Sequence, residues 1–161
     1  MLEIRKAIAA DNNQIWDIIQ EVISKADTYT FDPNSSKETM LDYWCGQDKH
    51  TYVATDNEAI VATFVIKHNQ PGLGSHIANA SYMVSEKASG KGVGKTIGQF
   101  SLQEAKRLGY KAMQFNIVVK SNTRAVKLWQ KLGFNIIGEI PDAFNHKEIG
   151  LTNAYIMHRK L

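Results

Sequence analysis

The sequence predicts an α/β fold in which a mixed central sheet of about seven strands is flanked by about four helices. Short runs rich in β-branched and aromatic residues alternate along the chain with longer segments whose apolar residues recur at helical spacing. Their order, β-α-α-β-β-β-α-β-α-β-β, is typical of a sheet with helices on both faces. The chain of 161 residues, 43% hydrophobic and 22% charged, has the size and composition of one globular domain. We therefore expect a single domain over residues 1–161.

The first half of the chain predicts a strand, two helices and three further strands. A strand at 2–9 precedes a helix that Asp11 caps, in which the apolar positions are Ile15, Ile18, Ile19, Val22 and Ile23. Ser36 caps a second, short helix that runs to Trp44. The turn-forming pair Asp56-Asn57 then joins two strands of a hairpin. The strands expected in this region cover 51–54, 59–67 and 76–84.

The second half begins with a glycine-rich segment and continues with helices that end at glycines. One helix runs from Val93 to Leu108 and is closed by Gly109, because glycine readily adopts the left-handed conformation that ends a helix. A second helix begins at Asn122 and ends before Gly133. The strands expected here cover 112–119, 134–140 and 153–158, with a loop at 141–152.

Composition and charge exclude several classes of protein. The net charge of +3 is spread along the chain without a basic run longer than two residues, so we expect no nucleic-acid partner. The start of the chain lacks the pattern of a signal peptide, and no stretch approaches the ~18 consecutive apolar residues of a membrane span. Cys45 is the only cysteine, which excludes an intramolecular disulfide and fits a reducing compartment. We expect a cytoplasmic protein with no membrane partner.

The segment between the expected strand at 76–84 and the following helix is suited to phosphate binding. Its glycines let backbone N–H groups approach a ligand closely, and the helix dipole is positive at this end. The candidate ligand-binding residues are Ser89, Gly90, Lys91, Gly92, Val93, Gly94 and Lys95. The alternative is a flexible glycine turn.

Two other phosphate-binding patterns fit this segment less well. Gly94-Lys95-Thr96 imitates the end of the nucleoside triphosphate loop, but Ser89 stands where that motif needs its first glycine. The dinucleotide pattern fails because Ile97 replaces its last glycine. A nucleotide hydrolase is therefore a disfavoured reading.

The glycines Gly92 and Gly94 match the motif [QR]-x-x-G-x-[GA], and the segment from Asn122 to Phe134 matches N-x-x-A-x-x-L-[Y]-x-x-x-G-F. Together, in this order and 30 residues apart (122 − 92 = 30), the two blocks resemble the GNAT (Gcn5-related) N-acetyltransferases. The resemblance is clear from about residue 60 to the end. It implies a GNAT fold and acetyl-coenzyme A as co-substrate, with no metal.

The resemblance also implies how the coenzyme is held. The pantetheine arm would pair with the backbone of Met83 and Val84, and Asn122 would contact the coenzyme, unless it is only a helix cap. The sequence departs from the family at Ser89, where the family has glutamine or arginine, and at Trp129, where it often has a proton-donating tyrosine. An indole cannot supply that proton, but a thiol pKa near ~8.5 makes the thiolate a tolerable leaving group. Trp129 is equally well read as a core aromatic.

The amine substrate must lose a proton before it attacks, but the strand at 76–84 carries no carboxylate. His76 and Tyr82 are candidates to bind or relay the proton, together with Trp129 at the leaving group. The simpler interpretation of His76 is a solvent-exposed histidine without a catalytic role. The other histidines are spaced too widely to suggest a metal site.

The function expected from the sequence is transfer of an acetyl group from acetyl-coenzyme A to a primary amine of a small molecule or peptide. The alternative is an acyl-coenzyme A sensor without turnover. A homodimer is a further expectation. The sequence does not name the acceptor, whose pocket we expect among Tyr29, Phe31, Tyr43, Trp44, Phe144, Asn145 and His146.

Overall fold

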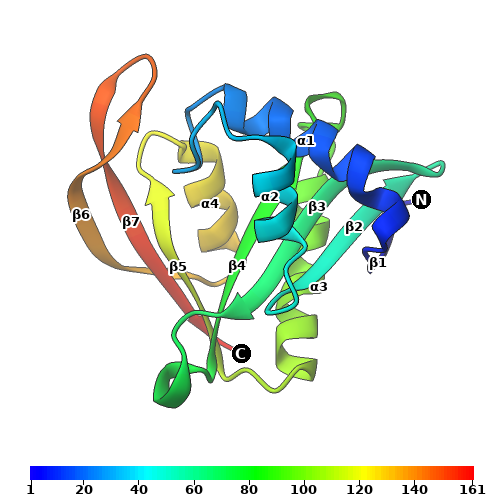
Figure 1. Cartoon of the computed structure of the whole chain (residues 1–161). Helices are drawn as coiled ribbons and strands as arrows, with labels where there is room; N and C mark the ends of the chain where they lie inside the picture. The colour runs from blue at the N-terminus through cyan, green and yellow to red at the C-terminus, as the bar shows by residue number, and fades with distance from the viewer.

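A seven-stranded mixed sheet forms the centre of the molecule in the computed structural model, which describes all 161 residues (Figure 1). The spatial order of the strands is β1-β2-β3-β4-β5-β7-β6. Only β4 and β5 are parallel, because the chain crosses from one to the other through a helix. The strands are β1 (Glu3–Lys6), β2 (His50–Asp56), β3 (Ala59–His68), β4 (Ile77–Val84), β5 (Ala112–Val119), β6 (Asn135–His146) and β7 (Gly150–Lys160).

Helices cover both faces of the sheet, as predicted from the sequence. The four helices are α1 (Asn12–Ser24), α2 (Lys37–Trp44), α3 (Val93–Arg107) and α4 (Thr123–Lys131). The apolar stripe of α1 packs with α2 on one face, where the buried core includes Ile15, Trp44 and Met83. On the other face α3 and α4 contribute Ile97 and Trp129 to a larger core. The expected mixed sheet of about seven strands, flanked by about four helices, is confirmed.

The parallel strands β4 and β5 are paired only where they begin. Ile77 and Ala78 pair with Ala112 and Met113, and no pairing follows beyond them. The side chain of Asn79 then bridges the widening gap by donating a hydrogen bond to the Gln114 carbonyl at 3.0 Å. The sheet is therefore split along most of the length of β4.

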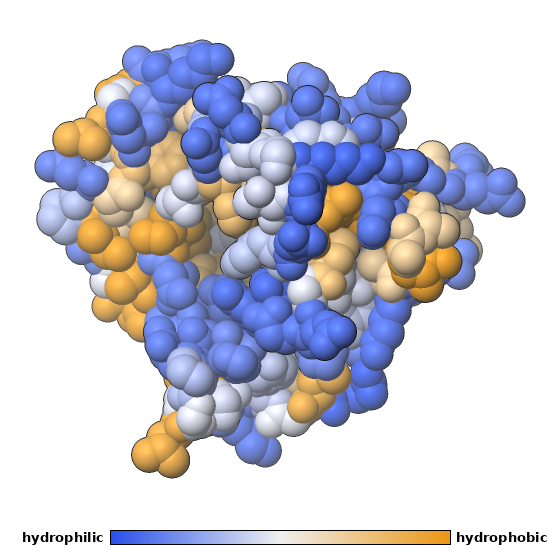
Figure 2. Space-filling view, viewed as in Figure 1, coloured by the Kyte–Doolittle hydropathy of each residue, from blue (hydrophilic) through white to orange (hydrophobic).

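The loop predicted at 141–152 is wrong, because β6 continues to His146 and β7 begins at Gly150. Pro141 suggested a loop, since proline lacks the N–H that a central strand must donate. However, β6 is the edge strand of the sheet, and its pairing with β7 shifts register between Ile140 and Phe144. Proline is tolerated at an edge and at such a bulge. Exposed apolar residues gather on this side of the molecule (Figure 2), and they include Ile136, Ile137 and Leu151.

The start of α1 also differs from the prediction. Asp11 precedes the helix, but its side chain makes no capping hydrogen bond. Its carboxylate instead accepts two hydrogen bonds from Arg5, at 2.8 and 2.9 Å, and one from the Ile8 amide at 2.8 Å. The Arg5 guanidinium lowers the pKa of Asp11. Asp11 therefore ties β1 to the start of α1.

Candidate active site

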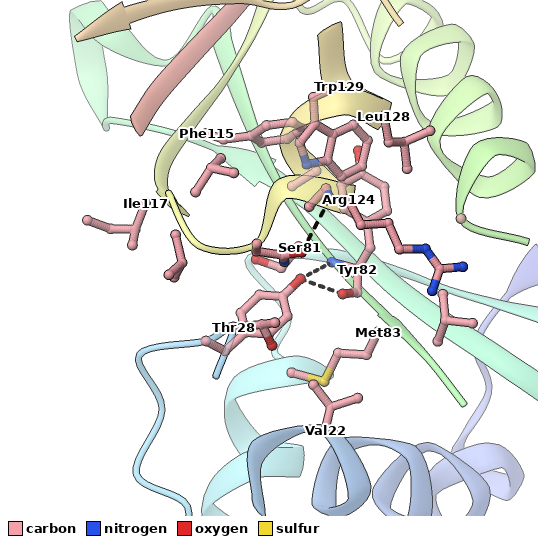
Figure 3. Close-up of a pocket in the computed structure, with 18 of the residues that line it drawn as sticks. Val22, Thr28, Ser81, Tyr82, Met83, Phe115, Ile117, Arg124, Leu128 and Trp129 are labelled. Atoms are coloured by element: carbon pink, nitrogen blue, oxygen red, sulfur yellow. Dashed lines mark hydrogen bonds between the residues drawn. The ribbon is translucent and has the colours of Figure 1, made fainter. Parts of the chain in front are cut away.

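A cavity of about 860 Å³ occupies the split between β4 and β5 (Figure 3). Its walls come from β4 and β5, from the segment that follows α1, from the glycine-rich segment and from α4. Thr28 and Val22 line it from the α1 side, while Arg124, Leu128 and Trp129 line it from α4 (Figure 3). A single cavity thus reaches from the glycine-rich segment to residues on the opposite face of the sheet.

The glycine-rich segment leaves backbone donors free at the start of α3. The first helical hydrogen bond runs from the Thr96 amide to the Gly92 carbonyl at 3.1 Å, so the amides of Val93, Gly94 and Lys95 have no backbone partner. Gly92 has a φ of +80° and nothing lies within 4 Å of where its Cβ would stand. A side chain there would be strained by the backbone rather than by crowding. Free amides at a helix N-terminus form an anion-binding site.

A guanidinium from α4 lies beside this segment, which the sequence did not predict. Arg124 donates a hydrogen bond from Nη1 to the Ser89 hydroxyl at 3.1 Å. A Cβ on Gly90 would lie 3.6 Å from Arg124 Nη2. The Arg124 guanidinium therefore lies next to residue 89, the position at which the GNAT motif has glutamine or arginine. The sequence did contain one signal for this role of Arg124, namely its position in the first turn of a helix that starts beside the split.

The edge of β4 that faces the split carries backbone groups that pair with no neighbouring strand beyond Ala78. The Ser85 amide donates to the Val61 carbonyl of β3. Because the amides of successive residues in a strand point to alternate sides, the Met83 amide is also directed toward β3. The amides of Tyr82 and Val84 then point toward the split. The backbone of both Met83 and Val84 was expected to hold the coenzyme. The backbone groups of Val84 lie on the open edge. Those of Met83 face β3, and the Met83 side chain is buried against α1.

A tyrosine from the segment after α1 covers the middle of this open edge. The Tyr82 amide donates a hydrogen bond to the Tyr29 hydroxyl at 2.8 Å, and the hydroxyl donates in turn to the Tyr82 carbonyl. Both hydrogen bonds are drawn as dashed lines at Tyr82 in Figure 3. Burial raises the pKa of the Tyr29 phenol to about 12, so it remains protonated at neutral pH.

An aromatic cluster forms the wall of the cavity beside α4. The Trp129 ring lies 4.8 Å from the Tyr82 ring and 4.7 Å from the Phe115 ring, measured between centroids. The Tyr82 hydroxyl is bonded to the Ser101 hydroxyl at 2.7 Å, which keeps it in the core, and burial raises its pKa. The Trp129 indole N–H donates no hydrogen bond within the protein. Every buried side-chain nitrogen or oxygen, in contrast, has a hydrogen-bond partner. The indole nitrogen is therefore accessible.

Several residues singled out in the sequence lie elsewhere. His76 and Lys91 are exposed and do not line the cavity. Asn122 lines it and also caps α4, accepting a hydrogen bond from the Ala125 amide at 3.3 Å. Trp44 is fully buried and donates from Nε1 to Thr63 at 2.9 Å. The expected acceptor-side residues divide accordingly: Tyr29, Phe31 and Tyr43 line the cavity, whereas Trp44, Phe144, Asn145 and His146 do not.

The structure brings no group of three or more histidine, cysteine, aspartate or glutamate side chains into a metal-binding arrangement. None of its helices is both long and apolar enough to cross a membrane.

A mixed sheet that splits between two parallel strands, beside a glycine-rich helix start, defines the class of N-acetyltransferase folds. The chain belongs to the Acetyltransferase (GNAT) family, whose model matches residues 16–134.

Individual relatives agree with this assignment. A GCN5-related N-acetyltransferase from Kribbella flavida is 40% identical, with a TM-score of 0.94 over 99% of this chain and 98% of that one. The yncA protein from Salmonella typhimurium, solved with its cofactor acetyl-CoA, is 19% identical, with a TM-score of 0.88 over 100% of this chain and 94% of that one, and shows the shared fold. N-acetyltransferase aca1 from Schizosaccharomyces pombe is 37% identical over 99 residues. That match covers 61% of this chain but only 47% of aca1.

Proposed function

We propose that this protein transfers an acetyl group from acetyl-coenzyme A to a primary amine by direct attack in a ternary complex. The observation that carries the proposal is the single cavity with an anion-binding helix start at one end and an open strand edge along its wall. The names of the aca1 and Kribbella flavida relatives and the acetyl-CoA in the yncA structure support it.

The residues of the cavity fit the coenzyme. The free amides at Val93, Gly94 and Lys95 would bind the pyrophosphate, with charge added by Lys95 and Arg124. Ser89 would then act mainly by holding the Arg124 guanidinium in place. The backbone of Val84 would pair with the amides of the pantetheine arm, as an added strand pairs with a sheet edge.

Acetyl-coenzyme A supplies the acetyl group as an activated thioester, and the chain must handle charge and protons around it. The Tyr82 amide points into the split and donates to the Tyr29 hydroxyl there; once that hydroxyl is displaced, the amide would stabilise negative charge on a reacting carbonyl oxygen. Asp27 is the only carboxylate that lines the cavity, so we assign to it, directly or through water, removal of the amine proton. His76, which is exposed outside the cavity, is a less suitable candidate.

The experiment that tests this function incubates the protein with acetyl-coenzyme A and a panel of amines that includes amino acids, polyamines and peptides. Acetylated product by mass, together with free thiol, is expected. Gly94→Glu is the matched inactive variant, because its Cβ makes only ordinary contact, 3.5 Å from Leu128, while its charge would repel the pyrophosphate. Coenzyme binding without product from any amine would identify a sensor instead. That the protein forms a homodimer stays a prediction, which analytical ultracentrifugation would test.

A further inference from the structure

The end of the cavity farthest from the glycine-rich segment contains unused hydrogen-bond donors. Lys67 near the end of β3 pairs with Asn79 near the start of β4, whereas the glycine-rich segment follows the end of β4 at Val84. Five residues separate Asn79 from Val84, which is ~17 Å along a strand. Lys67, Asn69 and Tyr43 all line the cavity at this far end.

Lys67 carries a positive charge that no carboxylate meets at ion-pair distance; the charge reaches Asp48 over a longer range, and Asp48 is itself paired with Lys49 at 2.8 Å. Its single side-chain hydrogen bond is donated to the Tyr43 hydroxyl at 3.3 Å, and its Nζ lies 5.4 Å from the centroid of the same ring. An ammonium has three N–H donors, so at least two remain free. The other cations of the cavity have different surroundings, since Lys25 pairs with Glu86 at 3.6 Å and Lys95 and Arg124 lie at the glycine-rich end.

The neighbours of Lys67 also offer donors rather than acceptors. Asn69 uses its side-chain oxygen to accept a hydrogen bond from Asn116 at 2.7 Å, which leaves its NH₂ group free. Tyr43 accepts from Lys67, and its own O–H donates to no group in the protein. One end of the cavity is thus lined by three groups whose N–H or O–H donors have no acceptor in the protein: the Lys67 ammonium, the Asn69 NH₂ and the Tyr43 hydroxyl. This combination suits an anion and repels a second cation.

We propose that the acetyl acceptor is a primary amine that also carries a carboxylate, which Lys67 binds with help from Asn69 and Tyr43. The inference rests on the proposed function, since it concerns the acceptor of the same reaction. The Tyr82 amide, beside the expected reaction centre, lies three residues from Asn79, or ~10 Å along the strand. A flexible lysine side chain and a small amino acid can together bridge this distance.

The test compares acceptors that differ only in the anion. Amino carboxylates from glycine to 6-aminohexanoate, their methylamides and spermidine are assayed with acetyl-coenzyme A, and their binding to the coenzyme A-bound protein is measured by calorimetry. We expect kcat/KM for the best carboxylate to exceed that of its methylamide by tenfold or more. Lys67→Gln should remove this preference, mainly through KM, without lowering the rate with methylamides. Lys67→Arg should restore much of it.

Lys111→Gln is the control, because Lys111 is an exposed cation that does not line the cavity. It should keep the preference, with thermal unfolding measured for every variant. Acetylation of methylamides or spermidine as efficiently as carboxylates, or an equal loss on all acceptors in Lys67→Gln, would overturn the inference and leave the proposed function standing. No acetylation and no binding of any amine would overturn both.

Discussion

The hydroxyl of Tyr29 accepts a hydrogen bond from the Tyr82 amide at 2.8 Å, in the middle of the open edge of β4. It also donates to the carbonyl of the same residue, so both backbone groups that Tyr82 presents to the split are occupied. They adjoin the backbone groups of Val84 on the same edge, and the Tyr82 amide is the donor that we place at the thioester oxygen. Coenzyme binding as proposed must therefore displace the Tyr29 hydroxyl, or at least one of its hydrogen bonds.

Tyr29→Phe should consequently bind acetyl-coenzyme A more tightly than the wild type. The coenzyme would no longer compete with a hydrogen bond whose net worth is about 0.5–1.5 kcal/mol, which corresponds to roughly a 2- to 12-fold lower Kd. Calorimetric titration measures the change. Tyr110→Phe is the control, since Tyr110 is half-buried, lies outside the cavity and makes no side-chain hydrogen bond. Weaker binding by Tyr29→Phe would mean that the phenol contacts the coenzyme and is not displaced.

Arg124→Ala should weaken coenzyme binding by about tenfold or more, because a guanidinium beside a phosphate makes charge-assisted hydrogen bonds worth about 1.5–3 kcal/mol. The loss should shrink as salt screens the charge. Lys127→Ala removes an exposed cation from the same helix outside the cavity and should change little. Adding Ser89→Arg to Arg124→Ala should recover affinity. Equal Kd values for Arg124→Ala and Lys127→Ala would remove Arg124 from the phosphate site.

Local sequence patterns predicted most of the fold. Helical spacing located all four helices, and Ser36 accepts a hydrogen bond from the Thr39 amide as expected, whereas the expected cap Asp11 does not cap its helix. The extension of β6 and β7 into residues 141–152 was missed because the effect of Pro141 depends on whether its strand lies at an edge, which only the tertiary structure decides.

The parts of the site that depend on pairs of distant residues could not be predicted from the sequence. The glycine-rich segment is local in sequence, so its free amides followed from the pattern alone. Tyr29 and Tyr82 are 53 residues apart, and Arg124 and Ser89 are 35 apart, so no spacing rule connects them. The end of pairing between β4 and β5 also leaves no local signal, because it results from how two strands pack in space.

Glu104→Gln tests an ion pair of α3 through its pH dependence. Arg107, followed by the Tyr52 hydroxyl at 2.7 Å, lowers the pKa of Glu104 to about 2. Because the folded pKa lies below the unfolded value near ~4.3, the carboxylate stabilises the fold above that value, and the contribution disappears as pH falls toward 2.

The variant should therefore lose about 1–2 kcal/mol of unfolding free energy at pH 7 and progressively less between pH ~4.3 and 2. Urea unfolding at pH 7 and pH 3 measures the difference. Glu148→Gln alters an exposed glutamate whose side chain forms none of the ion pairs, and it should change stability at neither pH. A Glu104→Gln loss that is the same at both pH values would show that packing, not charge, is responsible.

Trp129→Phe tests how the thiolate leaves without the tyrosine that the family often places here. The indole N–H is accessible and has no partner in the protein, so it is free to donate to a departing sulfur. A thiol pKa near ~8.5 nevertheless makes the thiolate a tolerable leaving group near neutral pH. If that is sufficient, the phenylalanine variant should lose less than about tenfold in kcat, or under ~1.4 kcal/mol of transition-state stabilisation.

Phenylalanine retains an aromatic ring between Tyr82 and Phe115, so coenzyme affinity and thermal unfolding should change little, and both are measured as controls. Single-turnover rates with a saturating amine separate the transfer step from product release. A hundredfold loss with intact coenzyme affinity would show that the indole N–H stabilises the sulfur as it departs. Trp129 would then be a catalytic residue, because its donor would act in the transition state and not in coenzyme binding.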